Sequence, residues 1–204
     1  MNQERALTDL AKKALKEWDI DVKNTHLFLQ SENTVFKVED VTGDTYALRI
    51  HRAGYHDLEE LNSEHAWTSS LSEAGLSVPE AVATKDGNAY ASVSFLDSDE
   101  SRYVGLVRWL EGDILNDLIL SLEKEEVADL YKSLGKVVAK FHKATMNWKM
   151  PKKFKRHSFD TEGFLGERPF WGRFWEAKSA SLVERSTLSE IRNKLKEVFS
   201  SLPK

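Results

Sequence analysis

The feature that most constrains the fold is a change in the spacing of apolar residues along the chain. Between residues 26 and 52, apolar residues alternate with polar ones in the runs HLFLQ, TVFKVEDV and TYALRIHR, which the turns SEN and TGD separate. This pattern predicts three successive antiparallel strands. After Gly112 the spacing becomes three and four residues, most clearly in EKEEVADLYKSLGKVVAKFHKAT, which predicts helices. The chain therefore combines a β-rich part with an α-helical part.

Helices and further strands complete the β-rich part. One helix is predicted in MNQERALTDLAKKALKEW, and a second in DLEELNSEHAWTSSLSEAG, which ends where Gly75 and Pro79 supply stop signals. Two more strands are predicted from the patterns VPEAVAT and AYASVSF, which flank the turn KDGN, and RYVGLVRWL, which comes after the polar link LDSDES. We predict an α+β fold, with a five-stranded antiparallel sheet in an N-terminal lobe at residues 1–110 and a helical lobe at residues 111–204.

Two more helices are predicted near the C-terminal end, after a loop at about residues 147–168. They cover PFWGRFWEAKSASLVE and STLSEIRNKLKEVFSSL, the second with Ser186 or Thr187 as its N-cap. The aromatic residues of the first have helical spacing, and we interpret them as core residues rather than a ligand platform.

Composition and charge exclude several function classes. The chain has 29 basic and 33 acidic residues and a net charge of -4, so it has no general attraction for nucleic acid or for anionic membranes. It contains no cysteine, which excludes disulfides, thiolate metal sites and a cysteine nucleophile. Neither a signal-peptide core nor an apolar run of about 20 residues is present. We expect a cytoplasmic protein without nucleic-acid or membrane partners.

The histidines do not predict a metal site. His51, His56 and His65 lie at strand and helix positions that need not converge, and we interpret them as scattered surface residues. His142 lies on the apolar face of a predicted helix, which favours a hydrogen-bonded core histidine.

Arg49 is the first residue that could carry chemistry. Alternation in TYALRIHR places Ala47, Arg49 and His51 on one face of the strand and apolar residues on the other. An isolated arginine at such a position usually points to solvent. Glu64, however, lies on the inward stripe of the following helix, where an unpaired carboxylate is costly. We therefore predict an ion pair between Arg49 and Glu64.

The order of these segments resembles the aminoglycoside phosphotransferase and homoserine or choline kinase group, small-molecule kinases with a two-lobed protein-kinase-like fold. The similar stretches run from about residue 24 to the end of the chain: SENTVFKVE, YALRIHR, LSEAGLSVPEAV, LVRWLEGDIL as the interlobe hinge, LGKVVAKFHKAT and FDTEGFLGERPFWGRFWEA. The resemblance implies an ATP-binding N-terminal lobe. It also implies phosphoryl transfer to a small hydroxyl compound, which the sequence does not identify.

The resemblance assigns three residues to the phosphate end of an ATP site. Arg49 is the basic residue that contacts the phosphates, a role that its permanent charge and bidentate geometry suit. Glu64 is its partner on the helix. Asn33, in the loop between the first two strands, is a further candidate ligand, although an asparagine in a turn serves local geometry equally well.

The resemblance assigns five further residues to the base end. Ala47 corresponds to the small residue below the adenine ring, Val35 to the apolar residue above it, and Val107 to the back of the pocket. The backbone of Arg108 and Leu110, in the hinge, is expected to form hydrogen bonds with the base.

The residues that perform phosphoryl transfer are missing from the sequence. The reaction needs an aspartate for the hydroxyl proton, and an asparagine and a second aspartate for magnesium. In the resembled family these lie in a His-x-Asp-x-x-x-x-Asn loop and a later Asp motif. No aspartate follows Asp160, and HSFD at residues 157–160 has the wrong spacing, which we interpret as a polar loop with Phe159 tucked inward. We expect a chain that stops before the catalytic loop, has no Mg²⁺ ligands and is inactive alone.

Three interpretations stay open. The chain is an incomplete ATP-dependent small-molecule kinase, or a non-catalytic nucleotide-binding or interaction protein of kinase-like fold, or a structural domain with a vestigial nucleotide pocket. Helices of an incomplete helical lobe would also expose apolar residues and favour self-association. The candidates for such exposure are Leu188, Ile191, Leu195 and Val198.

Overall fold

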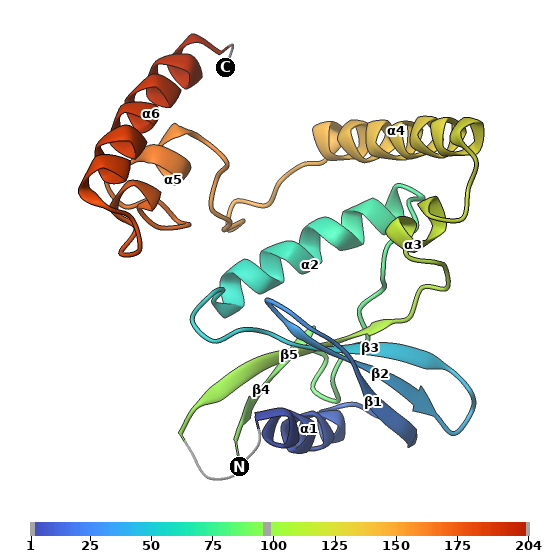
Figure 1. The fold of residues 1–204 in the computed structure, drawn as a ribbon. Coiled ribbons are helices and arrows are strands. Elements are labelled where there is room, and N and C mark those ends of the chain that lie inside the picture. Colours follow the sequence, from blue (N-terminus) through green and yellow to red (C-terminus); the bar gives the residue numbers. More distant parts are fainter. Residues whose placement is uncertain (1–2, 96–98, 203–204) are drawn as a thin grey trace. The chain divides into compact units, whose positions relative to one another are not determined.

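The computed structural model describes residues 3–95 and 99–202, which form two compact units (Figure 1). One unit ends at Lys155 and the other begins at Arg156. The lobe boundary that we predict at residue 110 lies within the first unit. The polar link predicted at residues 96–101 begins with three residues outside the described part of the chain.

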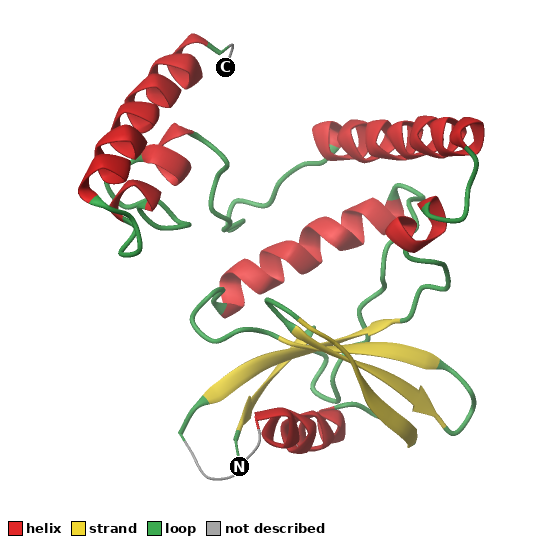
Figure 2. Cartoon of the chain, viewed as in Figure 1, coloured by secondary structure: helices red, strands yellow, loops and turns green. Residues whose placement is uncertain are grey.

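The first unit contains a five-stranded antiparallel sheet with the strand order β1-β2-β3-β5-β4. Its strands are yellow in Figure 2. The predicted α+β fold class and strand count are therefore confirmed. The strands are β1 (Val22–Gln30), β2 (Thr34–Asp40), β3 (Thr45–Ile50), β4 (Tyr90–Ser94) and β5 (Ser101–Arg108).

Helices lie on both faces of the sheet (Figure 1). Helix α1 (Gln3–Ala14) continues into a 3-10 turn at Leu15–Glu17, and its apolar stripe packs on one face. Helix α2 (Leu58–Glu73) lies over the other face. The main core lies between α1 and the sheet and includes Leu10, Ala11, Ala14, Leu15, Trp18, Phe36, Val38, Leu48, Ile50, Val104 and Leu106.

The two faces explain the clear alternation in β2 and β3. Every second residue of both strands is buried, and the residues between them are half-buried. In β3, Tyr46, Leu48 and Ile50 point into the core under α1. Ala47 and Arg49 consequently face the side of α2.

Helix α2 begins and ends where the sequence predicts. Asp57 and Glu60 form a capping box at its start, with reciprocal hydrogen bonds of 2.9 and 3.0 Å. At its end Gly75 has a φ of +78°, a left-handed conformation that glycine adopts without strain.

The prediction of a strand in VPEAVAT is wrong. This segment forms a single isolated bridge to the sheet, between Ala81 and Val107. Two hydrogen bonds of 2.8 Å flank the bridge, from the N–H of Val82 to the oxygen of Leu106 and from the N–H of Arg108 to the oxygen of Glu80. Nearby Pro79 has no N–H, which explains why alternation here does not extend into a ladder.

Two helices follow the sheet in the first unit. Helix α3 (Leu115–Ile119) is short, and α4 (Lys124–Asn147) matches the long predicted helix. The Trp67 Nε1–H of α2 donates to the Thr145 Oγ1 of α4 at 3.1 Å. The apolar face of α4 contains several exposed residues, among them Tyr131, Leu134, Val137 and Val138.

Two histidine interpretations are wrong. His142 of α4 is exposed and is not a core residue. His51 is only 5% exposed and packs edge-on against the Tyr90 ring, at 5.6 Å between ring centroids. His51 directly follows β3, and its N–H donates to the Tyr103 oxygen at 2.9 Å, as in a continuing strand. This backbone pairing keeps the His51 ring buried at the sheet.

The second unit contains α5 (Thr161–Leu165), a 3-10 turn at Phe174–Glu176, and α6 (Leu182–Ser201). The prediction of a helix through PFWGRFWEAKSASLVE is wrong. Gly172 has a φ of +85°, which interrupts helical geometry, although Trp175 is buried as expected of a core residue. Arg192 of α6 lies 3.9 Å from the centroid of the Trp175 ring.

Two local predictions in the second unit are also wrong. The N-cap of α6 is Ser181, not Ser186 or Thr187, because Ser181 and Glu184 form a capping box. Phe159 is 77% exposed and is not tucked inward, while the Asp160 side chain accepts the N–H of Gly163 and caps α5. Of the described helices, none combines the length and the apolar composition that spanning a bilayer requires.

Candidate functional site

The ion pair predicted between strand and helix is present. The Nη1 of Arg49, on β3, lies 3.3 Å from the Oε1 of Glu64, on α2. The side chains are 36% and 24% exposed, so solvent and ligands can reach the pair. Among the described residues, Glu64 is the carboxylate that Arg49 contacts, and this contact occupies one nitrogen of a guanidinium that carries five N–H donors. The remaining donors can engage an anion.

The sheet register fixes the surroundings of Arg49. Arg49 lies opposite Val35 of β2 on one side and opposite Gly105 of β5 on the other. A Cβ atom on Gly105 would lie 2.9 Å from the ring atom Cε1 of Tyr90, so a larger residue there would displace this ring. Gly105 therefore allows the Tyr90 ring to pack on the sheet beside Arg49, a role that sequence reasoning did not identify.

The residues predicted for the base end also lie together. Ala47 is opposite Val107 of β5 and opposite Lys37 of β2. Val35 is two residues from Lys37 and lies on the same face. Val35, Ala47 and Val107 are all half-buried, so they form a shallow apolar surface next to Arg49. Their role in binding a base stays a prediction.

An aromatic and cationic cluster borders this surface, and sequence reasoning missed it. The ammonium of Lys37 lies 4.4 Å from the centroid of the Trp109 ring, a cation–π contact. Phe28 of β1 packs edge-on against Trp109, with centroids 4.9 Å apart and planes at 84°. A lysine that alternates with buried residues usually points to solvent. Nothing in the sequence indicates that Lys37 contacts Trp109.

Backbone hydrogen bonds in the hinge limit which groups of Arg108 and Leu110 can contact a base. The Arg108 N–H already donates to Glu80, and the Trp109 N–H donates to the oxygen of Thr45 at 3.0 Å. Of the two backbone polar groups of Arg108, only the carbonyl oxygen is therefore available to a base. For the N–H of Leu110, the described residues provide no backbone acceptor, and Leu110 is 46% exposed.

The side chain of Arg108 points away from this surface. Its Nη1 lies 3.4 Å from the Oδ2 of Asp44, and its guanidinium lies 5.7 Å from the ring centroid of Tyr46, a residue of the α1 face. Arg49 and Arg108 are thus cations on opposite faces of neighbouring strands.

Asn33 has a local structural role in the loop between β1 and β2. Its Oδ1 accepts the N–H of Arg52 at 3.4 Å, and its carbonyl oxygen accepts the N–H of Ser31 at 3.0 Å. These bonds connect the loop to the end of β3. Contact of Asn33 with a ligand stays a prediction.

Comparison with known proteins gives consistent matches. A model of the phosphotransferase enzyme family matches residues 28–203. A microcompartment-associated aminopropanol kinase superposes with a TM-score of 0.74 and 28% identity, over 93% of this chain and 56% of that protein. The amicoumacin kinase hAmiN, solved with AMP-PNP, Ca²⁺ and Ami, gives a TM-score of 0.73 at 15% identity, over 100% of this chain and 55% of the other, and shows the fold alone.

No curated protein matches the chain. The chain spans a little over half the length of the two solved kinases.

Proposed function

The chain belongs to the phosphotransferase enzyme family, and we propose that its first unit is the nucleotide-binding part of an ATP-dependent small-molecule kinase. The observation that carries the proposal is the pair between Arg49 and Glu64, a reachable cation that a helix carboxylate holds beside a shallow apolar surface. In kinase-like folds such a pair holds nucleotide phosphates.

The residues of the site then have distinct roles. Arg49 binds phosphate oxygens through its remaining donors, and Glu64 orients the guanidinium. Ala47 leaves room for the base, which Val35 and Val107 border. The Arg108 carbonyl and the Leu110 N–H supply an acceptor and a donor for the edge of the base.

The acceptor of the proposed reaction is a small hydroxyl compound. Amino alcohols are the first class to test, because an aminopropanol kinase is 28% identical to this chain. Self-association through the exposed apolar residues of α4 and α6 belongs to the same proposal, and sedimentation velocity over a concentration series tests it.

Magnesium is expected to arrive with the nucleotide. Mg²⁺ prefers oxygen ligands, above all carboxylates and phosphates. Glu64 is the carboxylate that the described residues place against Arg49, and it is engaged in the ion pair. This donor set does not fit a protein-bound magnesium site, so no step is assigned to such a metal.

A second candidate function is nucleotide binding without catalysis. The absence of a His-x-Asp-x-x-x-x-Asn pattern from the sequence favours it for the 204-residue chain. We expect ATP binding without measurable phosphotransfer. Turnover of an amino alcohol that persists through rigorous purification would contradict this expectation.

Calorimetric titration with ATP and magnesium tests the proposed function. Arg49→Ala removes a charged phosphate contact, so we expect affinity to fall roughly 10- to 100-fold. Arg108→Ala is the matched control, because it removes a cation of the same type from the opposite face and keeps the hinge backbone. We expect it to change affinity less than threefold, about 0.6 kcal/mol. Equal losses in the two variants, or no ATP binding by the unmodified chain, would contradict the proposal.

A further inference from the structure

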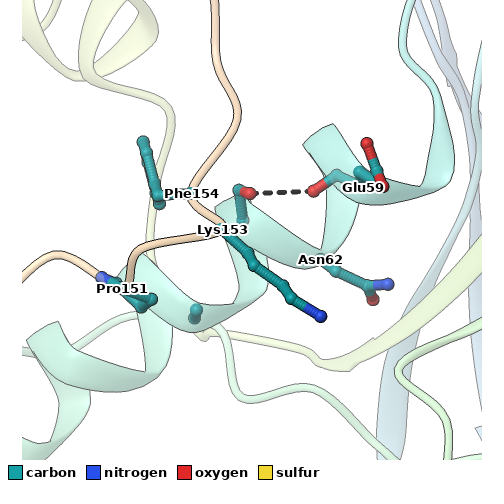
Figure 3. A pocket seen from close by; sticks show the side chains of 7 residues that line it. Glu59, Asn62, Pro151, Lys153 and Phe154 are labelled. Atoms are coloured by element: carbon teal, nitrogen blue, oxygen red, sulfur yellow. Dashed lines mark hydrogen bonds between the residues drawn. The ribbon is translucent and has the colours of Figure 1, made fainter.

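The segment that follows α4 returns to the N-terminal half of α2 (Figure 3). The backbone N–H of Lys155 donates to the Ser63 Oγ at 2.9 Å. The Lys155 ammonium contacts the Asp57 carboxylate and, at 3.2 Å, the Glu59 carboxylate. Ser63 is buried, and its hydroxyl donates in turn to the Glu59 carbonyl oxygen at 2.8 Å. We call these four residues, Lys155, Asp57, Glu59 and Ser63, the Lys155 clamp.

The rest of the segment packs on the same part of α2. Pro151, Lys153 and Phe154 line a pocket against Glu59, Asn62, Ser63 and Ala66. Phe154 also packs edge-on against Trp148, at 5.3 Å between ring centroids, which ties the segment to the end of α4. Figure 3 shows Lys153 extending along α2 on the side of Asn62, away from Glu59. Lys153 has no ion-pair partner among the described residues.

Helix α2 buries few of its apolar side chains. Of its apolar residues, Leu61 and Leu71 are buried, and the third buried residue of the helix is Ser63 of the clamp. Asp57 is the N-cap residue, so Lys155 contacts the point where the helix begins. Ser63 immediately precedes Glu64. A contact that fixes Ser63 therefore also fixes the turn that presents Glu64 to Arg49.

We propose that Lys155 is a positioning residue, whose clamp on the first half of α2 keeps Glu64 in contact with Arg49 and so maintains nucleotide affinity. The effect on affinity rests on the proposed function, whereas the effect on α2 does not. The contact with Lys155 lowers the pKa of the Asp57 carboxyl, and the contacts with Asp57 and Glu59 raise the pKa of the Lys155 ammonium. Both groups therefore stay charged at neutral pH.

The clamp is distinguishable from an ordinary stabilising contact. Its charged groups are about half-exposed or more, and exposed ion pairs contribute little to global stability. We therefore expect Lys155→Met to leave the thermal midpoint nearly unchanged while it loosens α2 locally. Lys153→Met is the matched control, because it removes the same charge from the same segment, and Lys153 forms no hydrogen bond or ion pair with the four described clamp residues.

The experiment measures amide hydrogen exchange at residues 58–64 and ATP affinity, in the full chain and its variants. We expect Lys155→Met to accelerate exchange in this half of α2 and to weaken ATP binding about 3- to 10-fold. Lys155→Arg is expected to restore both values toward those of the unmodified chain, and Lys153→Met to change neither.

Each arm can overturn the proposal. Unchanged exchange in Lys155→Met, or equal acceleration in Lys153→Met, would show that Lys155 does not hold α2. Faster exchange with unchanged ATP affinity would disprove the link to the pair of Arg49 and Glu64. If the unmodified chain binds no ATP, the proposed function fails, and the exchange arm alone decides whether the clamp holds α2.

Discussion

At the scale of single residues, the candidate site depends on how each side chain is held. The Arg49 guanidinium has permanent charge and a fixed partner, so it loses little freedom when an anion binds. The Lys37 ammonium is held differently, by the face of the Trp109 ring. The same ring packs on Phe28, so one aromatic side chain connects β1, β2 and the hinge.

This arrangement predicts that substitutions at the base end and at the phosphate end of the site affect ligand binding differently. Trp109→Ala removes the aromatic border of the base surface, so we expect ATP affinity to fall roughly tenfold, as for loss of a base-stacking contact. Affinity for inorganic tripolyphosphate, which has no base, should stay unchanged. Parallel calorimetric titrations with the two ligands measure both effects.

Arg49→Ala is the reference variant for that comparison, because it should lower the affinity for both ATP and tripolyphosphate. Equal weakening of ATP and tripolyphosphate by Trp109→Ala would mean that Trp109 does not border the base.

The sequence predicts the residues of the site unevenly. Arg49 and Glu64 could be paired from periodicity, since each lies on a definite face and burial of a lone carboxylate is unfavourable. Gly105 could not be identified, because its importance comes from the Tyr90 ring on the adjacent strand. The hydrogen bond from the Arg108 N–H to the Glu80 oxygen could not be predicted either, because Glu80 lies in a segment that pairs with β5 through a single isolated bridge.

At the scale of elements, turns and caps set the boundaries. The Asp40 side chain holds the turn between β2 and β3. It accepts the Thr42 hydroxyl at 2.7 Å, the N–H groups of Thr42 and Asp44 at 2.9 and 3.0 Å, and the Tyr46 hydroxyl at 3.0 Å. These bonds, that of the Thr42 hydroxyl above all, lower the pKa of the Asp40 carboxyl below its ordinary value of 3.8.

The lowered pKa predicts a pH-dependent contribution to stability. Because the pKa of Asp40 is lower in the folded than in the unfolded chain, the carboxylate's contribution to stability is present above the unfolded pKa of 3.8 and is lost as pH falls through the folded pKa. We expect Asp40→Asn to lower the thermal midpoint at pH 7, and the difference between the two proteins to shrink below about pH 4.

Thermal unfolding of both proteins from pH 7 to pH 2.5 measures this difference. Asp44→Asn is the control, because in the turn its carboxylate contacts only the exposed Arg108 among the described residues. A difference between Asp40→Asn and the unmodified chain that stays constant with pH would contradict the assigned role of the carboxylate.

The element predictions that fail do so for local reasons. VPEAVAT has strand-like alternation, yet Pro79 cannot donate to a ladder. The aromatic segment after Phe170 has helical spacing, yet Gly172 adopts a left-handed conformation within it. Ser181 forms a capping box with Glu184, which moves the start of α6 upstream of the predicted residues. Periodicity indicates which residues are buried, but it does not predict where a single residue, such as a proline, a glycine or a capping serine, ends a helix or strand.

At the scale of the whole molecule, the fold class, the strand count and the family could all be predicted from sequence. The division of the described chain at residues 155 and 156 could not, because it depends on which contacts form after α4. The Lys155 clamp lies on the first side of this division. Its connection to α2 joins residues more than 90 positions apart, a separation at which periodicity gives no information.

The central claim is that the α2-facing surface around Arg49 binds the nucleotide. The most direct test is a crystal structure of the chain with AMP-PNP and magnesium. We predict phosphate oxygens within hydrogen-bond distance of the Arg49 guanidinium, with the base over Ala47 and its edge at the Arg108 carbonyl and the Leu110 N–H. A nucleotide bound on the α1 face, or phosphates held away from Arg49, would contradict the claim.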